Sequence, residues 1–247
     1  MISNRESKFI KSLQLKKFRQ LENQFVVEGA KNVLELLQSD LEVIRVFATN
    51  DFLSKYQERL SEYSEVLTEV KEADLKKVGS FTSNNAALAL VKVPEQSEMD
   101  SSQSILAFDR IKDPGNLGTV IRIADWYGFK QIVCSTESVD CYNPKVISAT
   151  MGSFARVQVH YADLGEILQK SKHVYGTTLQ GDNIHELKFQ EPAVVVFGNE
   201  SEGLADDLRQ YLTQEVFIPG YGGAESLNVA VSTAVFCDNF RRLLKFQ

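Results

Sequence analysis

Short apolar runs alternate with helical patterns along the second half of the chain. The runs predict strands at residues 105–108, 131–134, 157–160, 174–178, 194–197 and 216–218. The spacing of apolar positions between them predicts helices at residues 119–127, 144–153, 164–170, 204–211 and 227–244. Residues 193–197, AVVVF, are apolar throughout, which suits a parallel sheet covered on both faces. The pattern therefore predicts an α/β fold: a doubly wound, parallel-sheet domain with helices on both faces.

The first 95 residues show a shorter alternation of the same kind. They predict a small α/β domain with helices near residues 3–15, 30–38 and 51–60 and strands at 25–27, 43–48 and 87–93. A polar, serine-rich stretch follows Pro94, and it is typical of a linker between domains. The predicted organisation is a domain at 1–95, a linker at 96–104 and a second domain at 105–247.

The composition of the 247 residues is that of an ordinary globular protein, with 43% hydrophobic and 24% charged side chains. No apolar run approaches the roughly 18 residues that a bilayer span needs. Three cysteines, Cys134, Cys141 and Cys237, show no CxxC spacing, so neither a disulfide framework nor a zinc site is indicated. We expect a cytoplasmic protein without a metal site or a membrane partner.

Positive charge gathers at the N-terminus although the net charge is −6. Against Glu6 alone, the first twenty residues carry Arg5, Lys8, Lys11, Lys16, Lys17 and Arg19. A local basic patch matters more to a polyanion than the net charge of the chain does. The segment is either a solvated helix face or a contact for phosphate groups.

Three loops that follow predicted strands are rich in glycine and polar residues. The first reads DPGNLG over residues 113–118 and leads to Arg122, and here Asn116 is expected to cap the following helix. The second reads GNESEGL over residues 198–204 and contains Glu200. The third reads PGYGGAESLNV over residues 219–229, and here Ser226 is expected to cap the last helix.

Ligands of open parallel sheets bind beyond the carboxyl ends of the strands, where all three loops lie. Backbone donors with the apolar Ile218 and Leu227 suit a nucleoside-like cofactor. The sequence has neither the Gly-Lys-Ser/Thr of a phosphate loop nor the Gly-x-Ser-x-Gly of a nucleophile elbow. The three histidines, His160, His173 and His185, show no partner spacing and are interpreted as structural.

Together the three loops resemble the three motifs of the SpoU (TrmH-type) RNA 2′-O-ribose methyltransferases, a branch of the SPOUT superfamily. The motifs occur in the order that is typical of this family, and NPK at 143–145 with Met151-Gly152 is similar to another family segment. The resemblance is dense over residues 105–240. It is looser over residues 1–95, which look like the family's ribosomal-protein-like substrate-binding domain.

The resemblance implies an S-adenosyl-L-methionine-dependent enzyme with a C-terminal trefoil knot, a homodimer formed through the knotted domain, and ribosomal or transfer RNA as substrate. The residues implied in the reacting site are Asn116, Arg122, Glu200, Ser226 and Asn228. Those implied in the cofactor site are Gly198, Ile218 and Leu227, with Thr178 and Gly222 as weaker candidates. The loop at 220–223 is more glycine-rich than is typical of the family, which leaves the role of Tyr221 open.

The implied reaction is the transfer of a methyl group to a ribose 2′-oxygen. Arg122 would accept the proton, or would stabilise the developing alkoxide while water takes the proton. Asn116 and Asn228 would orient the ribose or Arg122, and Glu200 would hold the substrate or Arg122. Within this interpretation the basic N-terminal segment becomes a phosphate contact.

Three other functions fit parts of the sequence. One is a non-catalytic RNA-binding relative of the same fold, although none of the implied reacting residues is missing. Another is a knotted RNA base methyltransferase, against which the SLN signature at 226–228 argues. The third is a nicotinamide-dependent oxidoreductase, which the absence of an opening GxGxxG fingerprint disfavours.

Overall fold

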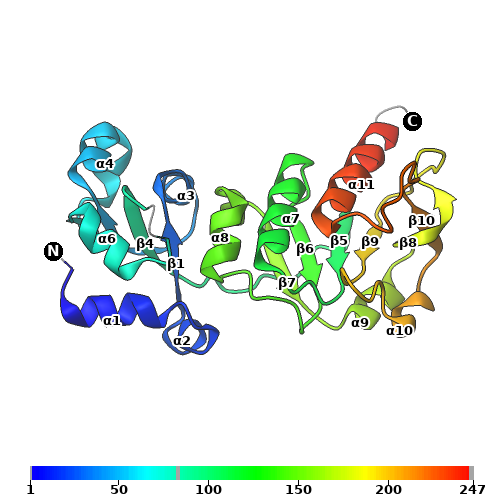
Figure 1. Cartoon of the computed structure of the whole chain (residues 1–247), viewed down its shortest axis with the longest axis horizontal. Helices are drawn as coiled ribbons and strands as arrows, with labels where there is room; N and C mark the ends of the chain where they lie inside the picture. Colours follow the sequence, from blue (N-terminus) through cyan, green and yellow to red (C-terminus); the bar gives the residue numbers. More distant parts are fainter. Residues whose placement is uncertain (1, 82–83, 245–247) are drawn as a thin grey trace. The chain divides into compact units, whose positions relative to one another are not determined.

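The computed structural model describes residues 2–81 and 84–244, which fall into two compact units (Figure 1). The N-terminal unit consists of Met1–Glu95 with Asp140–Arg156, and the C-terminal unit of Gln96–Val139 with Val157–Gln247.

A four-stranded sheet in the order β1-β4-β2-β3 forms the middle of the N-terminal unit. β4 pairs antiparallel with both β1 and β2, and β3 pairs parallel with β2. The strands are β1 (Gln24–Glu28), β2 (Val43–Ala48), β3 (Leu67–Glu69) and β4 (Ala87–Lys92). The helices are α1 (Asn4–Ser12), α2 (Lys16–Glu22), α3 (Ala30–Leu36), α4 (Asn50–Lys55), α5 (Gln57–Leu60), η1 (Ser61–Tyr63) and α6 (Glu72–Val78).

Alternating residues of these strands supply two cores, one on each face of the sheet. On one face Phe25 and Val27 pack with Val33 of α3. On the other face Val26 packs with Ile10 of α1, in a cluster that also contains α6 residues. The sheet is therefore buried on both sides, as the side-chain period of two requires.

A segment from the middle of the chain packs with the N-terminal unit. It contains α8 (Pro144–Thr150) and the short helix η2 (Ser153–Ala155). Ile147 belongs to the cluster around Phe25, and the rings of Tyr142 and Phe154 lie against the Phe25 ring. These residues fall within the range that the sequence analysis assigned to the second domain; their apolar side chains instead complete the core of the N-terminal unit.

The C-terminal unit contains a six-stranded sheet in the order β10-β8-β9-β5-β6-β7, and each neighbouring pair runs parallel. Its strands are β5 (Ile105–Phe108), β6 (Gln131–Cys134), β7 (Gln158–Tyr161), β8 (Val174–Asn183), β9 (Val194–Phe197) and β10 (Gln214–Phe217). Its helices are α7 (Pro114–Trp126), α9 (Leu164–Lys170), α10 (Asp206–Arg209) and α11 (Val229–Leu244).

Helices cover both faces of this sheet. Val194 and Val196 of β9 pack with Leu168 of α9 in one core cluster. The next residue along β9, Phe197, places its ring 5.7 Å from the ring of Phe236 in α11, which itself packs against α7. The predicted α/β class with a parallel sheet and a small α/β domain before it is confirmed, and the trefoil knot stays a prediction.

Several element boundaries differ from those predicted. The helix predicted at 3–15 corresponds to α1 alone, which ends at Ser12, and α2, which begins at Lys16, was not predicted. The short strand β3 and the helix α6 were not predicted. Thr178 does not end its strand: β8 continues past it, and the pairing of β8 with β10 skips several β8 residues around Gly181, which has φ +114°.

Candidate active site

The first and second loops lie next to each other because β5 and β9 are paired strands. Phe108 and Phe197, the last residues of these strands, are partners in the parallel register. Each loop therefore leaves the same edge of the sheet at adjacent positions. This edge is where parallel α/β sheets bind their ligands.

α7 begins at Pro114, five residues before the start predicted from the sequence at residue 119. Its N-cap is Asp113, whose side chain accepts a hydrogen bond of 2.8 Å from the backbone N–H of Asn116. The prediction that Asn116 is the cap was wrong. The helix already starts at Pro114, and the Asp113 carboxylate accepts from an N–H group of the first turn that has no partner within the helix. The Asn116 side chain is thus left for other contacts.

A chain of side-chain hydrogen bonds joins all three loops. Asn228 Nδ2 donates to Asn116 Oδ1 over 2.9 Å, and Asn116 Nδ2 donates to Glu200 Oε1 over 3.0 Å. Asn228 Oδ1 accepts the Ala230 N–H over 2.9 Å at the start of α11. Asn228, and not Ser226 as predicted, therefore caps the last helix, and this contact directs its amide nitrogen toward Asn116.

The other two implied reacting residues, Arg122 and Ser226, are not part of these hydrogen bonds between the three loops. Arg122 lies on the third turn of α7 and is exposed, and Ser226 is exposed in the third loop. Within residues 2–81 and 84–244, neither side chain has a hydrogen bond or ion pair. Arg122 is therefore an unconstrained guanidinium on the helix that carries Asn116.

The second loop is closed tightly on itself. The N–H of Asn199 donates to the Gly203 carbonyl and the Gly203 N–H donates back, each over 2.9 Å. Asn199 Oδ1 also accepts the N–H groups of Ser201 and Glu202. A Cβ at Gly198 would collide with the backbone of Gly203 and Leu204, so only glycine allows this closure.

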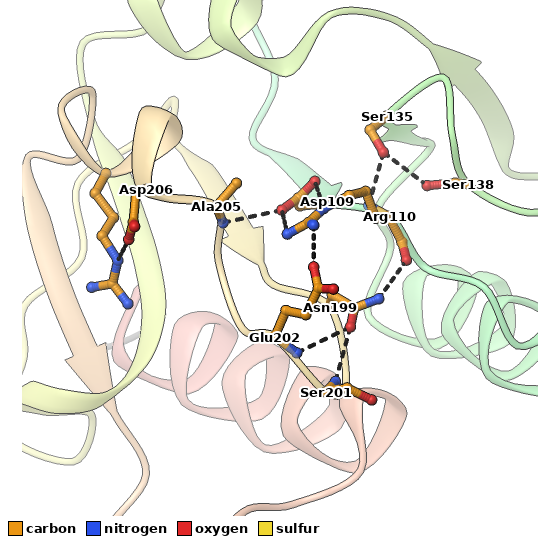
Figure 2. Close-up of polar contacts among 10 residues, drawn as sticks. Asp109, Arg110, Ser135, Ser138, Asn199, Ser201, Glu202, Ala205 and Asp206 are labelled. Carbon is orange, nitrogen blue, oxygen red and sulfur yellow. Dashed lines mark hydrogen bonds and ion pairs between the residues drawn. The ribbon is translucent and has the colours of Figure 1, made fainter.

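A charged cluster that the sequence analysis missed connects the first loop to the second (Figure 2). The buried Asp109 carboxylate accepts two hydrogen bonds from the Arg110 guanidinium, at 3.1 and 3.0 Å, and a third from the Ala205 N–H at 3.2 Å. The Arg110 guanidinium also pairs with Glu202. Its hydrogen bond to Asp109 is the main cause that raises the pKa of Arg110.

The backbone of Arg110 is held as firmly as its side chain. Its φ is +52°, its N–H donates to Ser135 Oγ over 2.8 Å, and its carbonyl accepts from Asn199 Nδ2 over 2.9 Å. The signal in the sequence was an adjacent Asp-Arg pair directly after a fully apolar strand. A charge in that position needs a partner, because burying an unpaired charge is costly.

The third loop has a different character. Within the described part of the chain, residues 218–227 make no backbone–backbone hydrogen bond. Nothing lies within 4 Å of a Cβ built on Gly220 or Gly222, Ile218 is half-buried, and Leu227 is 48% exposed. Tyr221 is 94% exposed.

Neither metal chemistry nor a membrane span is indicated by the described residues. No group of three or more His, Cys, Asp or Glu side chains among them could hold a metal ion. Of the helices in residues 2–81 and 84–244, none has the length and apolar character that crossing a membrane requires.

Comparisons with known proteins match both parts of the chain. Residues 103–238 match the SpoU rRNA Methylase family, and residues 4–89 match the MRM3-like substrate binding domain. The 23S rRNA (guanosine(2553)-2′-O)-methyltransferase RlmP of Bacillus subtilis is 30% identical over 246 residues, which cover 96% of each chain.

Solved structures agree over the whole length. A Porphyromonas gingivalis protein described as an RNA methyltransferase of the TrmH family has a TM-score of 0.86 and 32% identity, over 98% of this chain and 99% of that one. An AdoMet-bound rRNA methyltransferase from Sinorhizobium meliloti has a TM-score of 0.86 and 25% identity, over 99% and 97%. With the family model covering more than half of its length, this chain belongs to the SpoU rRNA methylase family.

Proposed function

We propose that this protein transfers a methyl group from S-adenosyl-L-methionine (AdoMet) to a ribose 2′-hydroxyl of RNA. The observation that carries the proposal is the hydrogen-bonded chain Asn228–Asn116–Glu200, which joins three loops at the carboxyl edge of the parallel sheet. Family membership supports the reaction class, and the name of the Bacillus subtilis relative supports a 2′-O-methylated 23S rRNA as product.

The third loop fits the adenosine part of AdoMet. Over residues 218–227 its backbone N–H and C=O groups have no backbone partner within the described residues, and they can bind the polar edge of a base. Ile218 and Leu227 offer apolar surface for the face of that base. Gly198 adds backbone groups at the end of β9. When bound, AdoMet supplies an electrophilic methyl group.

Thr178 and Gly222 are the weaker members of this proposed pocket. The Thr178 hydroxyl donates to the Gln180 carbonyl within β8, so its hydroxyl proton is already engaged. Gly222 leaves open space beside the loop rather than a close approach. We assign binding mainly to Gly198, Ile218 and Leu227.

Catalysis depends on activating a poor nucleophile. A guanidinium keeps its proton under nearly all conditions, so Arg122 stabilises the negative charge that develops on the 2′-oxygen and water takes the proton. Asn116 and Asn228 orient the ribose hydroxyls, and Glu200 fixes the Asn116 amide through its 3.0 Å hydrogen bond. Ser226 completes the reacting site from the third loop.

The N-terminal unit contributes RNA contacts through α1, α2 and the residues between them. The exposed cations there are Arg5, Lys8, Lys11, Lys16 and Lys17, and none of them has an ion pair within the described residues. Arg19 does not belong to this surface. It is 3% exposed, and its guanidinium bonds Asp140 at 2.5 and 3.0 Å and the Leu13 carbonyl at 2.8 Å.

Because Arg19 is buried, RNA binding by the basic N-terminal segment must be tested by substitution rather than by deletion. Deleting residues 1–19 would remove Ile10, Leu13 and Arg19 from the core of the unit, and so would test folding rather than RNA binding. Replacing Lys8, Lys11, Lys16 and Lys17 by Gln keeps the core. We expect the slope of log K for RNA against log salt to fall in magnitude, by about 0.7–0.9 for each phosphate that the variant no longer neutralises.

A second copy of the chain covers the outer surface of α7 and α11. Trp126 of α7 is 83% exposed and Val231 of α11 is 50% exposed, so both offer apolar surface to a partner. We assign this surface to a homodimer. Light scattering should report twice the chain mass, and Trp126→Lys should shift the protein to monomer.

The reaction is tested with purified protein, AdoMet, and in vitro transcribed 23S rRNA and transfer RNA, which carry no modifications. Nucleoside mass spectrometry should detect a 2′-O-methyl nucleoside. Arg122→Ala should lower kcat by about 10²–10³-fold. Arg209→Ala, which removes an exposed arginine paired with Glu215 at 3.0 Å, should leave kcat unchanged. A methylated base instead of a methylated ribose would refute the proposal.

A further inference from the structure

We propose that the Arg110 guanidinium is a binding site for an RNA phosphate, and that Glu202 occupies this site in the free protein. The inference rests on the proposed function, since it takes RNA as the ligand. It adds a residue to which the resemblance assigned no role, and it predicts that removing a carboxylate improves RNA binding.

The guanidinium of Arg110 is fixed in orientation by the groups around it. Asp109 is buried and receives its Nε and Nη2 donors, and Ser135 and Asn199 hold the backbone on either side. The Nη1 group is therefore directed to the far side of the guanidinium from Asp109, where it meets Glu202 (Figure 2). A planar guanidinium held in this way is preorganised for an oxyanion.

Glu202, the partner of Arg110 on this outer side, can readily be replaced by another anion. The Glu202 side chain is 67% exposed, whereas Asp109 is 5% exposed in the same cluster. Exposed ion pairs contribute little to stability, because water and salt screen them and the side chains lose freedom. A phosphate oxygen can replace the Glu202 carboxylate while Asp109 keeps its own hydrogen bonds, so no buried charge is left unpaired.

The position of the cluster suits a phosphate next to the reacting ribose. Arg110 lies in the segment between β5 and α7, the helix that carries Asn116, and Glu202 lies two residues after Glu200. Glu200 accepts from Asn116 in the proposed reacting site. Displacing Glu202 leaves Glu200 in place, since Asn199 Oδ1 and the two backbone bonds between Asn199 and Gly203 hold the loop independently.

Equilibrium binding of fluorescein-labelled, in vitro transcribed 23S rRNA fragments to the full-length protein, over 50–200 mM salt, tests this proposal. Glu202→Gln should bind RNA about twofold to fivefold more tightly than the wild type, the range set by the strength of one exposed ion pair. Arg110→Lys, which keeps a positive charge beside Asp109 but loses the guanidinium fork, should bind several-fold more weakly. Glu215→Gln is the matched control, because it removes the same charge from another exposed Arg–Glu pair and should change RNA affinity less than Glu202→Gln does.

A positioning role for the ion pair predicts the opposite result. If the Glu202–Arg110 pair serves only to shape the second loop, Glu202→Gln weakens RNA binding or leaves it unchanged, and either result overturns the proposal. An equal gain in Glu215→Gln also overturns it, because the effect would then be one of net charge. RNA that does not bind the wild type at 50 mM salt would refute both this proposal and the proposed function.

The two proposals can fail separately. A wild type that methylates RNA while Glu202→Gln shows no gain in affinity keeps the proposed function and removes the phosphate site. A tighter Glu202→Gln complex in a protein that methylates no ribose keeps the phosphate site and removes the proposed reaction. AdoMet affinity, measured by calorimetry, should be the same in all these variants.

Discussion

The second and third loops of the C-terminal unit contain similar residues, but they are held in different ways. The second loop has paired backbone bonds between Asn199 and Gly203, side-chain bonds from Asn199, and ties to Asp109 and Arg110. The third loop has no backbone–backbone hydrogen bond over residues 218–227 within the described chain, and it is tied to the first loop at its end, through Asn228.

This difference suggests a division of work between the two loops. The second loop is preorganised, so it can present Glu200 and the backbone of Gly198 without rearrangement. The third loop keeps its polar backbone groups available and can order around a ligand. Preorganisation saves ordering entropy at the reacting atoms, whereas a loop that orders on binding pays that entropy when it binds.

Gly198→Ala should have the largest effect. The added Cβ would collide with the backbone of Gly203 and Leu204, which cannot move away cheaply, so the second loop must open. A displacement of about 1 Å at a positioning group costs about 100-fold in rate, and we expect at least that loss in kcat/KM. Methylation assays should be combined with thermal unfolding, because a folded but inactive variant is the predicted outcome. Activity close to that of the wild type would show that the tight closure of the loop is dispensable.

Asn228→Ala should have the next largest effect. It removes both the tie to Asn116 and the cap of α11, and the loss of a helix cap typically costs about 1 kcal/mol of stability. Asn228→Asp keeps the cap but loses the amide donor to Asn116. If the tie positions the ribose, both variants should lose about tenfold in kcat, and only the alanine variant should unfold more easily. Full kcat in Asn228→Asp would assign the residue to capping alone.

Hydrogen exchange should separate the two loops directly. In the free protein the amides of Ser201, Glu202 and Gly203 should exchange more slowly than those of residues 220–226, because their N–H groups are bonded. AdoMet at about ten times its Kd should slow exchange in the third loop by about tenfold, and change the second loop by less than about twofold. Equal protection of both loops on binding would contradict the division of work.

Gly222→Ala should have the smallest effect, and it is the matched partner of Gly198→Ala. Nothing lies within 4 Å of the added Cβ, and Gly222 does not have a positive φ. Surface substitutions of this kind usually change stability by no more than about 0.5 kcal/mol, so we expect kcat and KM within about twofold of the wild type. A large loss of AdoMet affinity would instead place Gly222 against the cofactor.

Much of the fold follows from local patterns. The strands at 105–108, 131–134 and 194–197 have the predicted bounds, because short apolar runs between turn residues specify buried parallel strands. The small strand β3 and helix α6 escaped prediction. β3 has three residues, and its pairing with β2 depends on a partner more than twenty positions away rather than on its own composition.

The candidate site was predictable in its residue types and loops but not in its contacts. Asn116, Glu200 and Asn228 were named from the motifs, yet the bonds between them span 84 and 112 positions of the sequence. Asp113 rather than Asn116 caps α7. Arg19 is buried against Asp140 and the Leu13 carbonyl rather than part of the basic surface. In both cases the folded structure selects one of several partners that the sequence allows.

The sequence by itself determined the alternation of strands and helices, the three polar loops and their order along the chain. These depend on side-chain period and turn chemistry, which are properties of neighbouring residues. Only the tertiary structure decided that residues 140–156 complete the N-terminal core, that Asp109 holds Arg110, and that three loops share one hydrogen-bonded chain. Such contacts join residues far apart in the chain, and their partners are chosen by strand order and by the need to pair every buried polar group.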